Sequence, residues 1–442
     1  MSGEDMLSNV YRDFERLWIW ERLGDRLGWY LGVSINRYPA KYNIANRVAI
    51  PATSFKDIAS VEEALSIYEK ATQEFLSLWR DVRNGAEDIT RLERPGYSLL
   101  DLARDLIRAI VRRCVLCRWR CGVDRARGEK LGACMLTTES RIGSYFHHFG
   151  EELVFRGTHG SGTIFFTSCN MRCLFCQNSD ISRDRFNGIP YTPREIAQIA
   201  FLLRIEGCHN INWVGGEPTV HIHSIVEAIW HLANEGFRLM PRDGEIDKLL
   251  LTKADSYIPY HMDKRFGSYS GLFNAPMLFN TNMFLSKESM LILRPLIDIW
   301  LPDFKFGPGR CAIRLSRTPW YFETVAENLK KLYEWGEEMV IRHLVMPSHI
   351  ECCTKPVLEW IARNIPGTPV NVMDQYRPEA YADPHSPSFS PDAYDIARRP
   401  TREEIIRAWK YAEDLGLNYR EVTLEKKLSI RSLEGLKAII EN

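Results

Sequence analysis

The sequence lacks an excess of either charge, because 57 lysine and arginine residues stand against 57 aspartate and glutamate residues. Nucleic-acid binders and proteins that adsorb to anionic membranes usually carry a basic excess, so the composition disfavours both classes. The sequence also lacks repeats and any apolar run near the ~20 residues of a membrane helix. Residues 1–12 show no basic-then-apolar signal pattern. We therefore expect a cytoplasmic globular protein with no nucleic-acid or membrane partner.

Disulfides are not expected in such a chain, so its 11 cysteines are read as reduced thiols and metal ligands. Seven of them fall in two groups, Cys114 to Cys134 and Cys169 to Cys176, and this clustering predicts metal. The other four show no ligand spacing and are predicted to be buried free thiols: Cys208, Cys311, Cys352 and Cys353.

The second group has CxxxCxxC spacing, with Cys169, Cys173 and Cys176 following the apolar run Thr163–Thr167. Three thiolates on one loop can hold three irons of a [4Fe–4S] cluster and leave the fourth iron without a protein ligand. The alternatives are a zinc site or inert buried thiols. Zinc favours four ligands in a closed tetrahedron, and this loop offers three cysteines and no histidine. The spacing therefore favours a cluster with an open iron that binds a small molecule.

The first group has four cysteines in a short basic segment, Cys114, Cys117, Cys121 and Cys134. Four thiols are enough to close a zinc site or to hold a second iron–sulfur cluster. The spacing indicates a metal of some kind and leaves the choice between zinc and iron–sulfur open.

Short apolar runs alternate with helical patterns from residue 163 to residue 373. The predicted strands are Thr163–Ser168, Asn210–Val214, Met277–Thr281, Ile297–Leu301, Met339–Val345 and Val370–Met373. The helices between them are Pro193–Glu206, His223–Glu235, Lys287–Leu293, Trp320–Trp335 and Lys355–Arg363. Such alternation predicts an α/β protein with a parallel sheet, and six units predict a partial (β/α)6 barrel. Lys248–Thr252 is an alternative further strand, and Gly143–Gly162 is interpreted as a loop.

Helical periodicity also marks both ends of the chain. It predicts helices over Ser60–Arg83, Ser98–Arg113 and Thr401–Leu415, with a final helix near Arg431–Glu441 and a surface connection over Ala382–Pro400. We expect an α-helical N-terminal domain over 1–100 and a four-cysteine metal-binding module over 101–160. The barrel is expected over 161–380 and a C-terminal helical extension over 381–442.

Several motifs together carry a resemblance to a known family. Gly160–Phe166 leads into the cysteine loop, His148–Glu152 precedes it, and Gly215-Gly216-Glu217-Pro218 follows one unit later. With His209–Asn212, Leu301–Lys305, Arg342–Val345 and Gln375–Pro378, these segments resemble the radical S-adenosylmethionine (radical SAM) superfamily. The similarity is to the branch related to pyruvate formate-lyase activating enzymes, and it covers roughly residues 110 to 415.

The resemblance implies an oxidoreductase that binds a [4Fe–4S] cluster through Cys169, Cys173 and Cys176, and S-adenosylmethionine (SAM) at its open iron. The reduced cluster would cleave SAM to a 5′-deoxyadenosyl radical, which abstracts hydrogen from a substrate. A flavodoxin or ferredoxin type of electron donor is implied. Residues implied to contact the cofactor are Phe175, Gly215, Gly216, Glu217, Asn280, Thr281, Asn282, Asp303, Lys305 and Arg342.

Three functions stay open at this point. The first is an activase that makes a glycyl radical on a partner, or a modifier of peptides or proteins; the second is a radical SAM enzyme acting on a small molecule. The third is a cluster-bearing structural or electron-transfer protein without SAM turnover. His343 is interpreted equally as a site residue or a core histidine, and the insertion near 239–271 has no assigned role.

Overall fold

The computed structural model describes residues 11–237 and 263–425. The alternative strand over Lys248–Thr252, the final helix near Arg431–Glu441 and most of the insertion near 239–271 lie outside the described residues.

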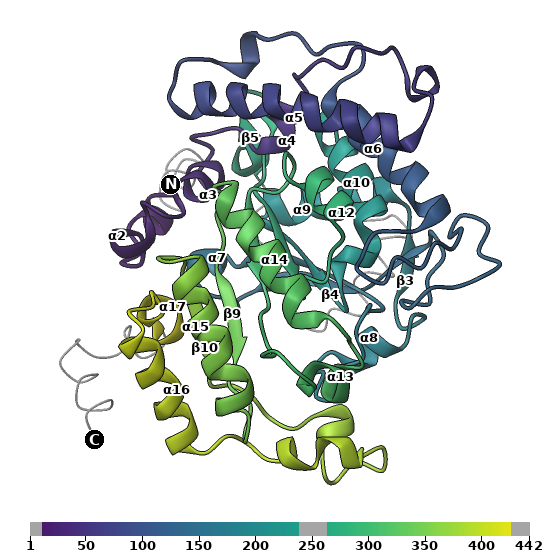
Figure 1. Ribbon diagram of the computed structural model, residues 1–442. Helices are drawn as coiled ribbons and strands as arrows, with labels where there is room; N and C mark the ends of the chain where they lie inside the picture. The colour runs from purple at the N-terminus through teal and green to yellow at the C-terminus, as the bar shows by residue number, and fades with distance from the viewer. Residues whose placement is uncertain (1–10, 238–262, 426–442) are drawn as a thin grey trace.

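Within the described residues, six parallel strands form the predicted partial (β/α)6 barrel (Figure 1). Strands β2, β4, β7 and β8 pair in that order, and β9 pairs with β10. Parallel bridges from Trp300 to Met339 and from Asp303 to Arg342 join β8 to β9. The strands are β2 (Ser161–Phe166), β4 (Ile211–Gly215), β7 (Met277–Thr281), β8 (Ile299–Pro302), β9 (Ile341–Leu344) and β10 (Val370–Met373).

A helix follows each of these strands, close to the predicted bounds: α9 (Pro193–Ile205), α10 (Ile222–Asn234), α12 (Lys287–Leu293), α14 (Tyr321–Glu334), α15 (Lys355–Asn364) and α16 (Arg402–Asp414). Local signals explain why the starts could be predicted. Thr192 and Glu195 form a capping box at the start of α9, with Pro193 in its first turn. Thr401 and Glu404 do the same for α16.

The prediction of a loop over Gly143–Gly162 is wrong. Half of this segment belongs to β1 (Ser140–His148), which pairs antiparallel with β2, and to the short helix α7 (Leu153–Arg156). The third strand at this edge is β3 (Ile189–Tyr191), antiparallel to β1. The register of β1 shifts between Ile142 and Ser144, and such an irregularity breaks the alternation by which a strand is recognised. Pairing with β2 stabilises β1, and that pairing is not visible in the local sequence.

The N-terminal region is helical, as expected, and packs onto the barrel. Helices α5 (Val61–Arg83) and α6 (Leu99–Ile110) pack against each other, and α6 packs on α10. In Figure 1, α5 runs along the top of the view, above the barrel helices. Apolar side chains of α5 and α6 belong to the same buried cluster as those of the barrel. Ser60 and Ser98 accept the capping hydrogen bonds at their starts.

A second apolar cluster closes the N-terminal end of the barrel. Side chains from residues 14–30, including those of α2 (Trp20–Leu23) and α3 (Gly28–Ser34), pack together with strands β7 and β8. Its members include Phe14, Ile19, Leu27, Tyr30, Phe155, Leu278, Ile299, Leu301 and Val340. With this end filled by packed side chains, we expect a site at the carboxyl ends of the strands, where α/β barrels carry their sites.

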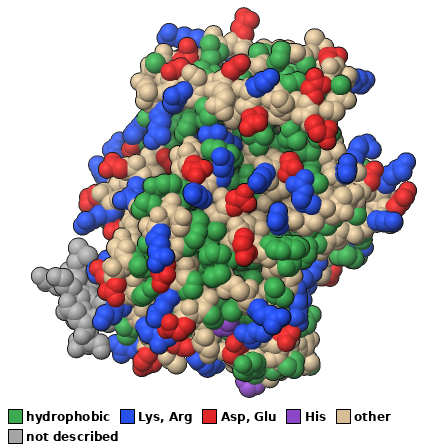
Figure 2. Space-filling view, viewed as in Figure 1, with side chains coloured by type: hydrophobic (Ala, Val, Ile, Leu, Met, Phe, Trp, Pro, Cys, Tyr) green, Lys and Arg blue, Asp and Glu red, His purple; other side chains and the backbone are tan. Residues whose placement is uncertain are grey.

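The segment expected as a surface connection, 382–400, forms short helical turns that pack on the barrel. It contains the 3₁₀ helix η8 (Pro391–Ile396), and Ala393 and Ile396 are buried. Among the described residues, no helix combines the length and apolarity that a membrane crossing requires. Acidic and basic side chains are interspersed over the face shown in Figure 2, as the balanced composition leads one to expect.

We expect the N-terminal helices and the barrel to depend on each other for stability. The Lys41 ammonium, just inside α4 (Lys41–Ala45), forms an ion pair with Glu337, and both side chains are 1% exposed. Replacing Lys41 by methionine leaves a buried carboxylate with Arg294 as its remaining ion-pair partner. The variant should lose about 3 kcal/mol of unfolding free energy, measured by urea denaturation. Arg37→Ala, which breaks an exposed ion pair with Glu15, is the control and should change it by less than about 1 kcal/mol.

Candidate functional site

The cysteine loop 169–176 begins where β2 ends, and its backbone is held by neighbouring segments. The amides of Arg172 and Leu174 donate to the carbonyls of Ser316 and Leu315, over 2.9 and 2.8 Å. Both acceptors belong to the short helix α13 (Cys311–Ser316), which follows β8. The carbonyl of Leu174 accepts from the amide of Tyr381. The loop therefore takes its shape from tertiary contacts rather than from a regular element.

The three thiols of this loop lie in surroundings that fit metal ligation. Cys169 is buried, and Cys173 and Cys176 are partly buried. Burial raises the pKa of Cys169, and burial together with the neighbouring Cys176 raises the pKa of Cys173 to about 12. Thiolates are disfavoured here without a compensating positive charge, which a bound metal centre supplies as it displaces the thiol protons. The donor set, three soft thiol ligands on one loop, fits an iron–sulfur cluster.

The glycine pair at the end of β4 lies against the start of this loop. Gly215 has a φ of +125°, which side chains rarely permit, and a Cβ on Gly216 would lie 1.8 Å from the carbonyl oxygen of Ser168. The two turns are thus in backbone contact, directly before Cys169. Only glycine allows this approach, which explains the Gly-Gly sequence at this position.

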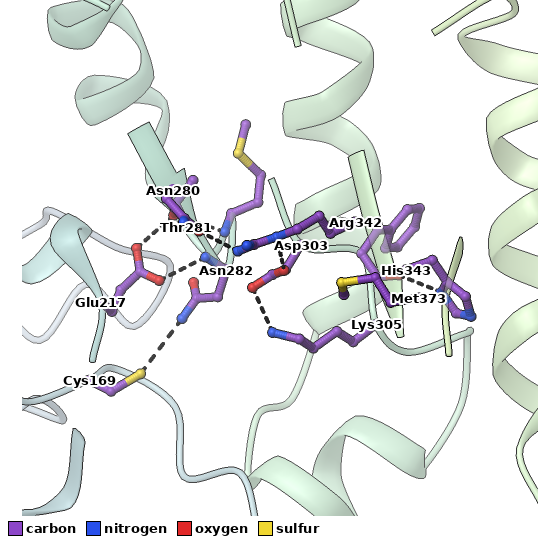
Figure 3. Close-up of polar contacts among 12 residues, drawn as sticks. Cys169, Glu217, Asn280, Thr281, Asn282, Asp303, Lys305, Arg342, His343 and Met373 are labelled. Carbon is purple, nitrogen blue, oxygen red and sulfur yellow. Dashed lines mark hydrogen bonds and ion pairs between the residues drawn. The ribbon is translucent and has the colours of Figure 1, made fainter. Parts of the chain in front are cut away.

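Glu217 joins the ends of β4 and β7 (Figure 3). Its carboxylate accepts hydrogen bonds from the amide and hydroxyl of Thr219, from the Thr281 hydroxyl and from the Asn282 amide, at 2.6–3.1 Å. Burial raises its pKa. The Asn282 side-chain amide donates to Asn170 Oδ1 at 2.7 Å and lies 3.8 Å from Cys169 Sγ. Glu217 therefore fixes the residues that border the cysteine loop, and its predicted contact with SAM stays a prediction.

Polar side chains from three neighbouring strand ends form one buried network (Figure 3). Lys305 Nζ donates to Asp303 Oδ2 at 2.6 Å, and Arg342 Nε donates to Asp303 Oδ1 at 3.1 Å. A terminal nitrogen of Arg342 donates to Asn280 Oδ1. Burial acts to raise the pKa of Asp303, but Arg342 and Lys305 outweigh it and hold the pKa below its ordinary value. Asn280, Asp303, Lys305 and Arg342, four of the predicted residues, are thus brought together in one polar network.

Two further carboxylates enter the barrel beside this network, and the sequence analysis did not assign them to the site. Glu151 lies 3.1 Å from His148 Nδ1 and 3.7 Å from Arg342, and accepts from the side-chain amide of Asn212 at 3.3 Å. Glu152 accepts from Asn371 at 2.8 Å, and its second oxygen is buried without a hydrogen-bond partner. Burial, together with the adjacent Glu151, raises the pKa of Glu152 to about 7. The two adjacent carboxylates in the His148–Glu152 motif were the sequence feature that could have indicated these site residues.

The four predicted cysteines of the first group line one cavity, which Val220 and Arg125 also border. This module touches the cysteine loop directly. The indole of Trp119 donates to the carbonyl of Asn170 at 2.7 Å, and Arg172 donates to the carbonyl of Ala133 at 2.8 Å. Cys114, Cys117, Cys121 and Cys134 are therefore brought together, next to Cys169–Cys176.

Two of the remaining predicted residues, Phe175 and His343, are buried in the core. Phe175 is buried and packs on Phe306 and Tyr376, with ring centroids 5.9 and 5.8 Å apart. His343 is a core histidine, buried between the Phe304 carbonyl at 2.8 Å and the Thr354 hydroxyl at 3.0 Å, and burial lowers its pKa to about 4.

The prediction that the other four cysteines are buried free thiols holds for Cys208 and Cys353, whereas Cys311 is only partly buried and Cys352 is exposed. Cys311, Cys352 and Cys353 lie together with His349. The spacing His349-x-x-Cys352-Cys353 was a signal for this cluster in the sequence. Cys311 is distant in sequence, so the tertiary structure alone adds it.

Comparison with known proteins finds both sequence and structural relatives. The family model of the radical SAM superfamily matches residues 163–361. An uncharacterized protein of Methanocaldococcus jannaschii is 35% identical over 399 residues, which span 89% of this chain and 98% of that protein. A second uncharacterized protein of that organism is 36% identical over 84 residues, or 18% of this chain and 24% of its own length.

Two solved structures are also similar. SuiB of Streptococcus suis bound to the precursor peptide SuiA has a TM-score of 0.36 and 14% identity, covering 62% of this chain and 52% of that one. A domain of pyruvate-formate lyase-activating enzyme from Bacteroides vulgatus has a TM-score of 0.26 and 16% identity, covering 39% of this chain and 88% of that one.

The contact between the two turns can be tested at Gly216. Gly216→Ala places a methyl group within 1.8 Å of the Ser168 carbonyl, so one of the two turns must move. We expect a loss of about 3 kcal/mol of unfolding free energy or more, measured by denaturation. Gly96→Ala is the matched control, because nothing lies within 4 Å of its added methyl group, and it should be neutral within about 0.5 kcal/mol.

The raised pKa of Glu152 makes stability depend on pH. The unfolded carboxyl releases its proton near 4.5 and the folded one near 7, so the folded state binds more protons between these values. Stability should therefore fall as pH rises through this window. Glu152→Gln removes this titration. The unfolding free energy of the variant, relative to that of the wild type, should therefore increase as the pH rises from about 5 to about 8. Glu62→Gln, on the exposed face of α5, is the control; an equal gain there would contradict the assignment to Glu152.

Proposed function

Because the chain belongs to the radical SAM superfamily, we propose that it is an enzyme that reductively cleaves SAM and abstracts hydrogen from a substrate. The observation that carries this proposal is the position of the CxxxCxxC loop. It follows β2 and borders the polar carboxyl ends of β4 and β7, with Asn282 next to Cys169. A structural or electron-transfer protein has no need for such a bordering polar surface.

Cys169, Cys173 and Cys176 would hold the [4Fe–4S] cluster. When bound, the cluster in its reduced state supplies one electron to SAM, which yields methionine and a 5′-deoxyadenosyl radical. The protein would position the cluster and exclude water from it. Phe166, Phe175 and Met171 are buried around the loop, and a water-poor environment helps to keep the cluster potential low.

Glycine and polar residues at the strand ends would bind SAM. The turn of Gly215 and Gly216 leaves backbone next to the loop without side chains in the way. Glu217 holds Thr281 and Asn282 at the end of β7, so these two residues present fixed polar groups. Asn280, Asp303, Lys305 and Arg342 extend this surface toward the barrel interior.

We propose a second iron–sulfur cluster at Cys114, Cys117, Cys121 and Cys134. The four thiols surround a cavity. A single metal ion requires ligand atoms that lie close together. Among the described residues, the cluster of Cys311, His349, Cys352 and Cys353 is the one group whose ligand atoms all lie within 4.8 Å of one another, so the wider spacing of these four thiols favours a multi-iron cluster over one zinc ion. Contacts of Trp119 and Ala133 with the cysteine loop support a role in passing electrons from a flavodoxin- or ferredoxin-type donor.

The substrate that the barrel interior suits is polar. Glu151, Glu152 and Arg342 line the interior, and one oxygen of Glu152 has no hydrogen-bond partner in the protein. We propose a peptide or protein substrate, which the sequence resemblance to activating enzymes supports. A small polar metabolite is the competing class.

Iron content and SAM cleavage test the activity. The chain reconstituted anaerobically should bind about eight irons and, with reductant and SAM, should form 5′-deoxyadenosine. Cys176→Ala should lose about four irons and all 5′-deoxyadenosine, whereas Cys208→Ala, in the same fold but outside both groups, should keep them. No 5′-deoxyadenosine from wild type with a full complement of iron would overturn the proposal.

Deuterium transfer distinguishes the substrate classes. Peptides or proteins captured from the source organism would be labelled with deuterium and incubated with the enzyme and SAM. Deuterium in the 5′-deoxyadenosine from a protein fraction supports the peptide or protein class. Deuterium from the small-molecule fraction alone supports a metabolite.

A further inference from the structure

A cluster of three thiols and one imidazole lies outside the proposed SAM site. Cys311 begins α13, the segment that follows β8. His349 directly precedes the π-helical turn η6 (Ile350–Thr354), which follows β9 and carries Cys352 and Cys353. The four ligand atoms all lie within 4.8 Å of one another.

Distances within the cluster match a tetrahedral metal site. Cys352 Sγ lies 3.6 Å from Cys311 Sγ and 3.9 Å from Cys353 Sγ. His349 Nδ1 lies 3.2 Å from Cys352 Sγ and 3.5 Å from Cys353 Sγ. In a zinc tetrahedron, with Zn–S near 2.3 Å and Zn–N near 2.0–2.1 Å, neighbouring ligand atoms lie about 3.5–3.8 Å apart. The observed separations cluster around these values.

The other nitrogen of His349 is oriented as in metal sites. Its Nε2 lies 3.2 Å from Asp395 Oδ2, and Arg314 holds that carboxylate with two hydrogen bonds of 2.8 and 2.6 Å. A histidine that binds metal through one ring nitrogen usually donates from the other to a carboxylate, which fixes its tautomer and orientation. Nδ1 is thereby directed at the three thiols.

We propose that Cys311, His349, Cys352 and Cys353 bind one structural Zn²⁺ ion. Three thiolates and one imidazole are a ligand set that zinc favours, and four protein ligands close the tetrahedron without a position for substrate. The site is therefore distinct from both cysteine groups of the iron–sulfur chemistry, and it does not depend on SAM cleavage.

The zinc ion would stabilise α13, one of the segments that bind the cysteine loop. It ties α13 to the turn after β9, where the backbones already approach so closely that a Cβ on Gly307 would lie 2.1 Å from the Cys352 carbonyl. The far end of α13 provides the Ser316 and Leu315 carbonyls that bind the loop amides. Asp395 connects the same site to η8. Metal at this point would fix α13, and through it the position of the Cys169–Cys176 loop.

Metal analysis of the full chain, purified anaerobically, tests the site. We expect about one zinc per chain beside the iron, and zinc X-ray absorption that shows three sulfurs near 2.3 Å and one nitrogen near 2.0–2.1 Å. Four sulfurs and no nitrogen would assign the zinc to Cys114–Cys134 and overturn the proposal. Absence of zinc, with iron alone or with the three thiols oxidised, would also overturn it.

Variants assign the zinc to its ligands. Cys352→Ser changes an exposed side chain and should lose the zinc while keeping the iron, whereas Cys117→Ser should lose iron and keep the zinc. Cys208→Ser is the matched control and should keep both metals. The opposite pattern in the first two variants overturns the proposal.

A second variant covers the case in which Cys352→Ser does not fold. Asp395→Asn leaves all four ligands in place and should weaken zinc binding about 10–100-fold, measured by competition with a chelator. The melting temperature of the wild type should fall when the chelator removes zinc. Unchanged zinc affinity in Asp395→Asn would count against His349 as a ligand.

Discussion

The constraint on which the site depends is the pairing of charge inside the barrel. Asp303, Lys305 and Arg342 stand on neighbouring strand ends; Asp303 is buried, and Lys305 and Arg342 are partly buried. An unpaired charge in this environment costs several kcal/mol, so each residue requires the others. Because the pairs run across strands, they also fix the relative position of β7, β8 and β9. The polar interior is thus a consequence of where parallel strands end and of the requirement that buried charges be paired.

The two ends of the barrel differ in the polarity of the side chains that occupy them. Apolar residues from 14–30 fill the N-terminal end, while polar residues and the cysteine loop occupy the carboxyl end. The helices of the N-terminal region therefore do more than cover a surface. Their apolar side chains pack against β7 and β8, which leaves the carboxyl ends of the strands as the end where α/β barrels usually carry their sites.

The cysteine loop has no regular structure of its own, and its neighbours hold it in place. The four-cysteine module contacts it through Trp119 and Ala133, and α13 contacts it through the Ser316 and Leu315 carbonyls. The proposed second iron–sulfur cluster and the proposed zinc ion would each lie next to a segment that contacts this loop. Metal bonds fix backbone segments that are too short to form a core.

The sequence by itself determined the alternation of the barrel strands and helices, their approximate bounds and the CxxxCxxC loop, because these depend on local periodicity, capping residues and spacing. The spacing of Cys169, Cys173 and Cys176 was enough to identify this group without the structure. Only the tertiary structure decided that β1 is a strand, since its pairing with β2 is non-local and its register is irregular. Likewise, Glu151, Glu152 and the Cys311–Cys353 cluster join their partners only when distant strand ends meet, because ligand geometry depends on distance in space and not on separation along the chain.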